Sequence, residues 1–188
     1  MGLRDALFGR KKLAEPKDDR LFALTTAAVT LNVELGLTSS GAGAIAFKPQ
    51  SSGEFRSAFD DVDQLVEAVA KQSGSTIERK SDEYGFDWLI VNDDQLEDLV
   101  TTVHTVASEL TAQGFGSQLL AAAFRFSGGE HPVYWIYGFK RGAFWPFVPL
   151  ADQKRDNATE LELKAKLENE LPIEPDLTRW LALFDAPI

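Results

Sequence analysis

The sequence contains no cysteine, one methionine and two histidines among its 188 residues. The absence of cysteine excludes disulfide bridges, a thiolate nucleophile and metal sites built on thiolates. The two histidines, His104 and His131, lie 27 positions apart, which does not favour a histidine-rich metal site. We therefore expect no cofactor, no metal site and no catalytic residue in this chain.

Basic residues are also scarce, with 19 Lys and Arg against 29 Asp and Glu, so that the formal net charge is −10. Proteins that bind nucleic acid carry basic surfaces that neutralise phosphate, so this balance argues against a nucleic-acid partner. No apolar run reaches the roughly 20 residues that a membrane-spanning helix needs. Hydrophobic residues make up 44% of the chain and charged residues 26%, which is typical of a folded globular protein.

The first residues differ from the rest of the chain in charge. Residues 1–12 hold four basic side chains and one acidic one, a balance of +3, so the remainder carries −13. On a helix Leu3, Leu7 and Phe8 would share one side, and we expect them to contact an anionic membrane surface. The basic residues expected to join them there are Arg4, Arg10, Lys11 and Lys12. We interpret residues 1–17 as a flexible basic segment and residues 18–188 as one domain, although a basic end without any partner would read the same way.

Hydrophobic periodicity predicts the elements of the body. Apolar residues recur every three to four positions in three segments that end near glycine, so helices are expected there. These helices are expected at about 18–35, 55–73 and 93–113, and strands at 44–48, 75–78, 86–91, 118–126, 133–139 and 143–148. Residues 38–43 have the composition of a turn, and the strand with Pro146 should lie at a sheet edge because proline donates no ladder hydrogen bond.

The C-terminal quarter should be helical again. Asn157, with Glu160 three residues later, predicts a capped helix, and residues 176–184 predict a short final helix. Strands joined by short turns pair antiparallel. The sequence thus predicts an α+β fold, an antiparallel sheet with helices packed mainly on one face.

Residues 134–147 are unusually aromatic, and both faces of the predicted strand are apolar. Such a segment is either covered on both sides or exposes a patch that binds another protein. For the second alternative the expected partner-binding residues are Tyr137, Arg141, Phe144 and Trp145, because aromatic residues and arginine are favoured at interfaces. An enzyme of an unrecognised class stays open as well, and a polar pocket holding His104, a carboxylate and a hydroxyl would favour it.

Blocks of residues along nearly the whole chain resemble the PspA-associated protein PspAB family. These blocks are Met1-Gly-Leu-x-Asp-Ala-Leu-Phe-Gly-Arg10, Leu21-Phe-Ala-Leu-x-x-Ala-Ala-Val-Thr-Leu31, Phe47-Lys-Pro49, Asp82-Glu-Tyr-Gly-Phe86, Glu97-Asp-Leu-Val-x-x-Val-His104, Gly114-Phe-Gly116, Pro132-Val-Tyr134, Tyr137-Gly-Phe-Lys-Arg-Gly142, Arg155-Asp-Asn157, Asp176-Leu-x-Arg-Trp180 and Ala186-Pro187. None of the blocks is a catalytic signature.

The resemblance implies a non-enzymatic binding or regulatory protein of the phage-shock response to membrane stress. PspA-type protein or a membrane protease would be its partner, and the cytoplasm or the inner face of the cytoplasmic membrane its location. The body also resembles, more faintly, the fold of YbjN-like proteins and type III secretion chaperones, which implies a chaperone-like binder of polypeptides that forms homodimers.

Overall fold

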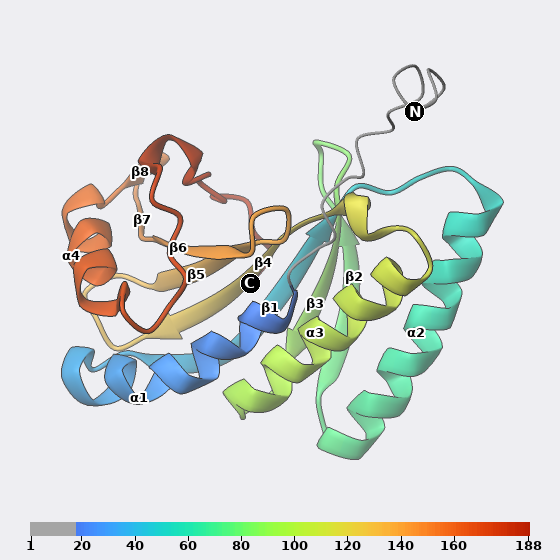
Figure 1. The fold of residues 1–188 in the computed structure, drawn as a ribbon, viewed down its shortest axis with the longest axis horizontal. Helices are drawn as coiled ribbons and strands as arrows, with labels where there is room; N and C mark the ends of the chain where they lie inside the picture. Colours follow the sequence, from blue (N-terminus) through green and yellow to red (C-terminus); the bar gives the residue numbers. More distant parts are fainter. Residues whose placement is uncertain (1–17) are drawn as a thin grey trace, which may run out of the picture.

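The structure, a computed structural model, describes residues 18–188, which form a layer of helices on an antiparallel sheet (Figure 1). The helices are α1 (Ala23–Leu35), α2 (Gly53–Ser73), α3 (Leu96–Ala112) and α4 (Asn157–Leu167), and the 3-10 turns are η1 (Asp18–Phe22), η2 (Gly116–Gln118) and η3 (Leu177–Arg179). The strands of the sheet are β1 (Thr38–Phe47), β2 (Thr76–Ser81), β3 (Asp87–Asn92), β4 (Leu119–Ser127), β5 (Val133–Gly138) and β6 (Ala143–Phe147), in the spatial order β2-β3-β1-β4-β5-β6. A short ribbon, β7 (Pro149–Leu150) and β8 (Lys154–Arg155), leads into α4. The predicted α+β fold is thus confirmed.

Helices α1, α2 and α3 cover one face of the sheet and build the main core with it. The apolar positions that define the predicted periods are the buried ones, as in Leu24 and Leu31 of α1 and Leu99 and Val103 of α3. Gly36 ends α1 with a positive φ of 65°, and the Leu37 N–H donates to the Leu31 carbonyl. This is the glycine stop that the sequence predicts.

Strand β1 corrects one prediction. The segment 38–43, expected to be a turn, is the first half of this strand. Its register with β4 shifts between Ser39 and Ala42, and Gly41 lies in this bulge with a φ of 74°. A Cβ at Gly41 would stand 3.0 Å from the Asp93 carbonyl oxygen. The glycine that suggests a turn therefore allows a β-bulge inside a continuous strand.

The last residues of the chain cover the opposite face of the sheet. That face carries Ala121, Ala123, Ile136, Trp145 and Phe147 on one half and Ala44, Ala46, Trp88 and Ile90 on the other. Trp180, Leu183, Phe184, Ala186 and Ile188 pack on it. The predicted helix at 176–184 is therefore wrong, since only Leu177–Arg179 forms a helical turn and an extended strap over a sheet can place more side chains against it.

Hydrogen bonds attach this C-terminal strap, residues 174–188, to the sheet. The Trp145 indole N–H donates to the Leu181 carbonyl at 3.0 Å, and the Tyr134 hydroxyl donates to the Ile188 carbonyl at 3.0 Å. The Trp180 indole N–H donates to the Glu174 carbonyl at 2.9 Å. The polar atoms of Trp145, Tyr134 and Trp180 thus each have a partner, which holds the strap in one register.

Helix α4 begins one residue earlier than predicted. Asp156, not Asn157, is its cap, and its carboxylate accepts from the Thr159 N–H at 3.0 Å. Glu160 is almost fully buried and accepts from Arg155 Nε at 2.8 Å and from the Val148 N–H at 2.9 Å. Burial raises the pKa of Glu160, whereas the bonds from Arg155 and Val148 oppose that rise. The Glu160 carboxylate therefore holds α4 against the strands and does not form a capping box.

Within residues 18–188 no helix is both long enough and apolar enough to cross a lipid bilayer.

Truncating the strap at its buried ring should destabilise the domain. Trp180 is 6% exposed, and its neighbour Leu181 is 63% exposed. We expect Trp180→Ala to lower the free energy of unfolding by about 3 to 5 kcal/mol. Leu181→Ala is the matched control and should stay within about 0.5 kcal/mol of the parent. Urea denaturation measures both, and equal values would show that the strap does not belong to the core.

Candidate protein-binding site

The structure places the predicted aromatic anchors in the interior. Tyr137 and Phe144 have no exposed surface and lie in the main core, whereas Trp145 is 5% exposed and lies under the strap. Of the two alternatives for residues 134–147, a covered segment and an exposed patch, these three rings therefore follow the first. The expectation of exposed aromatic anchors is corrected, because helices cover one side of the strands and the strap the other.

Strand β6 does lie at a sheet edge, as Pro146 indicates, but part of this edge is occupied. The Phe144 N–H donates to the Pro172 carbonyl at 2.8 Å, and the Glu174 N–H donates to the Phe144 carbonyl at 2.9 Å. Arg141 keeps about half of its side chain exposed, and its Nε lies 3.5 Å from the buried Glu174 carboxylate. In this arrangement Arg141 attaches the strap; contact between Arg141 and a partner stays a prediction.

Two contacts of His104 use the same ring nitrogen. Its Nε2 atom lies 3.3 Å from Asp19 Oδ1 and 3.4 Å from Ser108 Oγ. In a relay the carboxylate and the hydroxyl contact opposite ring nitrogens, whereas both of these contacts use the same one. Asp19 is 95% exposed, and the Phe22 ring centroid lies 4.9 Å from that of His104. These contacts join η1 to α3.

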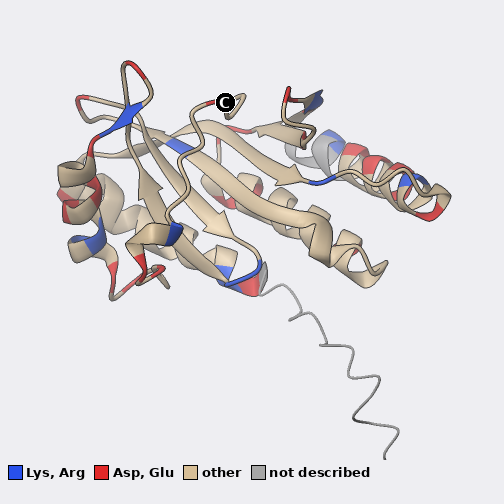
Figure 2. Ribbon diagram, turned by 90° about the horizontal axis from the view of Figure 1, so that it is seen from above, with Lys and Arg blue, Asp and Glu red and all other residues tan. Residues whose placement is uncertain are grey.

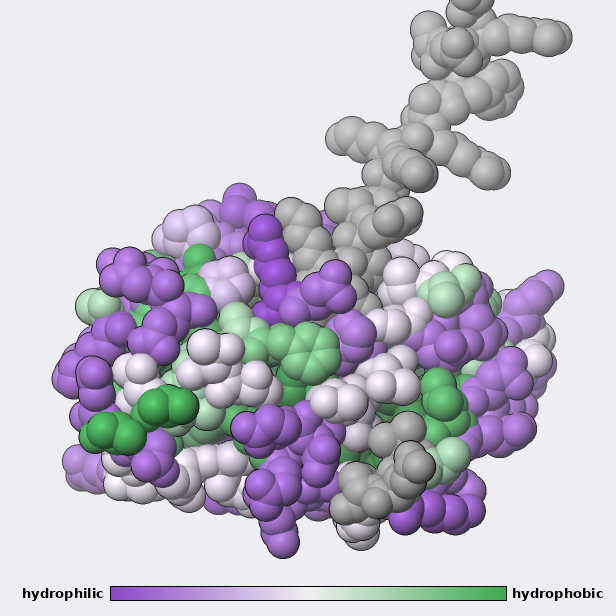
Figure 3. All heavy atoms as spheres, turned by 60° about the horizontal axis from the view of Figure 1, so that its bottom comes forward, coloured by the Kyte–Doolittle hydropathy of each residue, from purple (hydrophilic) through white to green (hydrophobic). Residues whose placement is uncertain are grey.

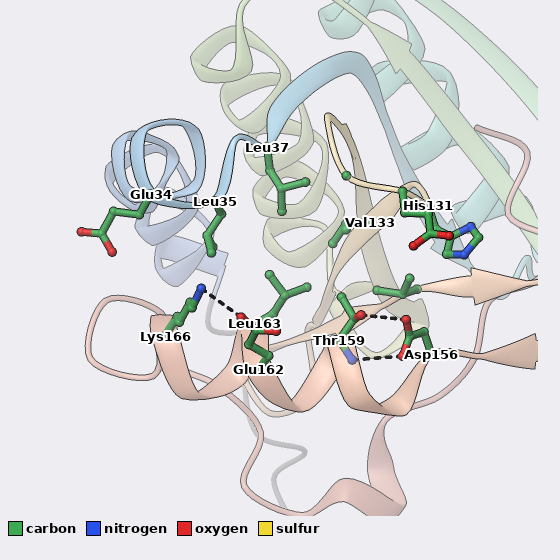
Figure 4. A pocket seen from close by; sticks show the side chains of 13 residues that line it. Glu34, Leu35, Leu37, His131, Val133, Asp156, Thr159, Glu162, Leu163 and Lys166 are labelled. Carbon is green, nitrogen blue, oxygen red and sulfur yellow. Dashed lines mark hydrogen bonds and ion pairs between the residues drawn. The ribbon is translucent and has the colours of Figure 1, made fainter.

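A cavity opens between the C-terminal end of α1 and helix α4 (Figure 4). It holds about 260 Å³, and its floor consists of Leu35, Leu37, Val133, Val148 and Leu163. Four separate parts of the chain contribute: the end of α1 with the start of β1, the β4–β5 turn, the end of β6 and one side of α4. We call it the α1–α4 cavity. An apolar floor inside a polar rim is typical of a binding site.

The rim of the α1–α4 cavity is mainly acidic. Its charged residues are Glu34, Glu130, Asp156, Glu162 and Lys166, and His131 and Thr159 complete it. Lys166 Nζ lies 3.0 Å from Glu162 Oε1, so the one lysine is already paired. Besides His131, the rim has four carboxylates and one ammonium group. It therefore favours a ligand group that is cationic and partly apolar.

Asp156 has a double role in this rim. Its carboxylate accepts from the Thr159 hydroxyl at 2.7 Å and from the Thr159 N–H at 3.0 Å. These bonds lower the pKa of Asp156 despite a small opposing effect of burial, and the charge of His131 lowers it further. Asp156 is therefore ionised at neutral pH, and it begins α4 while facing the cavity.

Sequence reasoning missed this cavity. Its residues are spread from Glu34 to Lys166 and form no motif, so the fold alone brings them together. His131 lies between β4 and β5, and nothing in the sequence indicates that this segment lies against α4. Within residues 18–188 no group of three or more His, Asp or Glu side chains is placed to hold a metal ion. The predicted membrane-contact residues, Leu3, Arg4, Leu7, Phe8, Arg10, Lys11 and Lys12, lie outside the described residues.

Comparison with known proteins gives one match. The family model PspAB, described as PspA associated protein B, matches residues 1–188. No curated protein and no solved structure matches the chain. The faint likeness to YbjN-like proteins and secretion chaperones therefore stays a prediction.

Removing the cap of α4 should weaken the domain in a pH-dependent way. Because the pKa of Asp156 is lower in the folded state than its ordinary value of 3.8, its contribution to stability is present above that value and is lost as pH falls through the folded pKa. We expect Asp156→Ala to lower the melting temperature at neutral pH, and the difference to shrink below about pH 4. Asn157→Ala is the control and should have the smaller effect. A difference that does not depend on pH would contradict the assignment of the cap.

Proposed function

The chain belongs to the PspA-associated protein B family, and on this premise we propose that it is a regulatory binding protein of the phage-shock response that acts by protein–protein contact near the cytoplasmic membrane. Membership of the family implies association with PspA. The finer statement, that this chain works by binding and not by catalysis, is our proposal. The match over residues 1–188 is the observation that carries it.

The described residues support a binding role in two ways. Two contacts of His104, to Asp19 and to Ser108, use the same ring nitrogen, and the first of them joins η1 to α3. The α1–α4 cavity, by contrast, offers an apolar floor and an acidic rim and suits a charged anchor of a partner. Such a cavity can bind a basic side chain without any catalytic step.

Direct binding tests this function. The purified chain should bind purified PspA of the same organism in titration calorimetry, with an affinity in the micromolar range that is common for transient partners, about 8 kcal/mol of binding free energy. Because the chain carries −10 overall, a basic region of PspA should contribute, so the affinity should fall as salt is added. No binding at low salt, with both proteins folded by circular dichroism, would contradict the proposal.

The basic residues near the start of the chain should add a weak affinity for membranes. Each basic residue close to an anionic surface contributes about 1 kcal/mol, and the acidic body opposes this. We expect co-sedimentation with vesicles rich in anionic phospholipid to decrease on deletion of residues 1–12 and on addition of salt, with neutral phosphatidylcholine vesicles as the control. Unchanged sedimentation of the deletion variant would exclude Arg4, Arg10, Lys11 and Lys12 as membrane contacts.

A further inference from the structure

Helix α1 exposes apolar side chains that its own fold does not use. Leu24, Ala27 and Leu31 point into the core, whereas Val29 is 68% exposed and Val33 is 76% exposed. Valine is a weaker helix former than most polar residues, so these two positions serve neither the helix nor the core. Figure 3, which brings the α1 side forward, shows pale and green side chains over the left and central part of this face, bordered by hydrophilic ones.

The exposed residues of this region follow the spacing of a helix–helix contact. Phe22, Thr26, Val29 and Val33 are all exposed and are separated by four, three and four residues. Thr26, Val29 and Val33 thereby form one stripe along α1, as the a and d positions of a coiled coil do, and Phe22 precedes them at the end of η1, where one side of its ring packs on His104. We call these four residues the α1 seam. Three turns of such spacing fit an α-helix laid alongside α1.

Few charges border this surface, and the nearest recorded one is the Glu170 carboxylate, which accepts from the Thr30 hydroxyl at 2.8 Å. Glu34 is the one charged residue of α1. The neighbouring face of α3 shows Thr101, Thr105 and Ser108, and Figure 2 shows the Asp, Glu, Lys and Arg of the helices gathered chiefly on α2 and α4. The domain as a whole is strongly acidic, so most of its surface repels an acidic partner. The α1 seam does not repel such a partner. An apolar contact on the seam buries no charged group, so no charge has to lose its hydration there.

The α1 seam leads toward the α1–α4 cavity. Val33 is followed directly by Glu34 and Leu35, which line that cavity. Of the rim carboxylates, Glu162 is paired with Lys166 and Asp156 accepts from Thr159, which leaves Glu34 and Glu130 as the ones we assign to a ligand. Figure 4 shows Leu35, Leu37 and Leu163 around one space, with Glu34 directed outward at its margin. A helix that lies on the seam would bring its next side chains to this rim. Charge complementarity requires those side chains to be basic.

We propose that the α1 seam and the α1–α4 cavity together dock an amphipathic α-helix of PspA, whose uncharged apolar stripe packs on Phe22, Thr26, Val29 and Val33 and whose following Lys or Arg enters the acidic rim. This inference rests on the proposed association with PspA. In this proposal the helices make the contact with PspA, and the buried aromatic strands belong to the core.

Substitutions on the seam test the apolar contact. Val29→Gln and Val33→Gln should each lower the affinity for purified PspA about tenfold, and the double variant more than either, because a buried apolar contact is lost. Both positions are exposed and glutamine favours helix more than valine, so folding and melting temperature should be retained. Leu65→Gln on α2, where the side chain is 38% exposed, is the matched control and should bind as the parent does.

Neutral variants of the rim test the basic anchor. Glu34→Gln together with Glu130→Gln should weaken binding and reduce its salt dependence, because two carboxylates no longer attract the cation. A photo-crosslinker at position 33 should attach to a PspA helix next to a Lys or Arg, whereas one at position 65 should not attach. Unchanged or tighter binding of the rim variant would show that the anchor is not basic and would overturn the proposal.

The outcomes separate the surface from the function. If the parent protein does not bind PspA at all, the proposed function fails. If the parent binds and the double valine variant binds equally well, the function stands and the seam is excluded. If sedimentation equilibrium shows a dimer of the parent that the double variant loses, while PspA binding is unchanged, the seam is occupied by a second copy of this chain and the proposed occupant is wrong.

Discussion

A sheet that is apolar on both faces must be covered on both faces, and this requirement governs the rest of the molecule. Along β1 and β3, Ile45 and Leu89 face the helices while Ala44 and Trp88 face the other way. Helices α1, α2 and α3 bury the first face. The second is left to the residues after α4, which must run extended to reach from Trp145 to Trp88. A helix there would cover less of the sheet.

The polar atoms under the strap make this cover specific. Burying an indole N–H without an acceptor costs about 1 to 3 kcal/mol, and the carbonyls of Leu181 and Glu174 accept from Trp145 and Trp180. Glu174 is itself buried, and Arg141 and Arg179 lie within 3.6 Å of its carboxylate. Because an unpaired buried carboxylate would be costly, these arginines hold the start of the strap in place. Together with the backbone bonds of Phe144, these contacts occupy part of the β6 edge and engage Arg141, about half of whose side chain stays exposed.

The sequence predicts the fold where a residue acts through its own neighbours in the chain. Gly36 ends α1 and Gly114 follows α3 because the positive φ of each glycine is a local property. Pro146 marks the edge strand because its lack of a backbone N–H is likewise a local property. Predictions fail where a distant segment decides: Gly41 bends a strand because Asp93 lies against it, and residues 176–184 are extended because the sheet face needs a cover.

The candidate site is less predictable than the fold, and for a related reason. The aromatic residues at 134–147 stand out in the sequence, but aromatic rings serve a core as well as an interface, and only the strap decides between the two. The residues of the α1–α4 cavity have no common motif and meet through β-sheet pairing and helix packing. What the sequence does contain is a helix with a single charged residue and with valines outside its buried stripe. This pattern weakens a helix prediction and becomes informative only once the buried side is known.

The exposed side of α1 therefore has to be explained by something other than folding. A helix of this length is held by its buried side, and Leu24, Ala27 and Leu31 already provide that. Polar residues at 29 and 33 would support the helix at least as well and would reduce exposed apolar surface. Elsewhere the protein has many carboxylates, on α2, around the turn between β2 and β3 and at the cavity rim. The uncharged stripe therefore does not result from a shortage of acidic residues in the chain. An apolar helix face beside an acidic cavity, on a domain whose sheet is closed on both faces, is where contact with another helix costs the least desolvation.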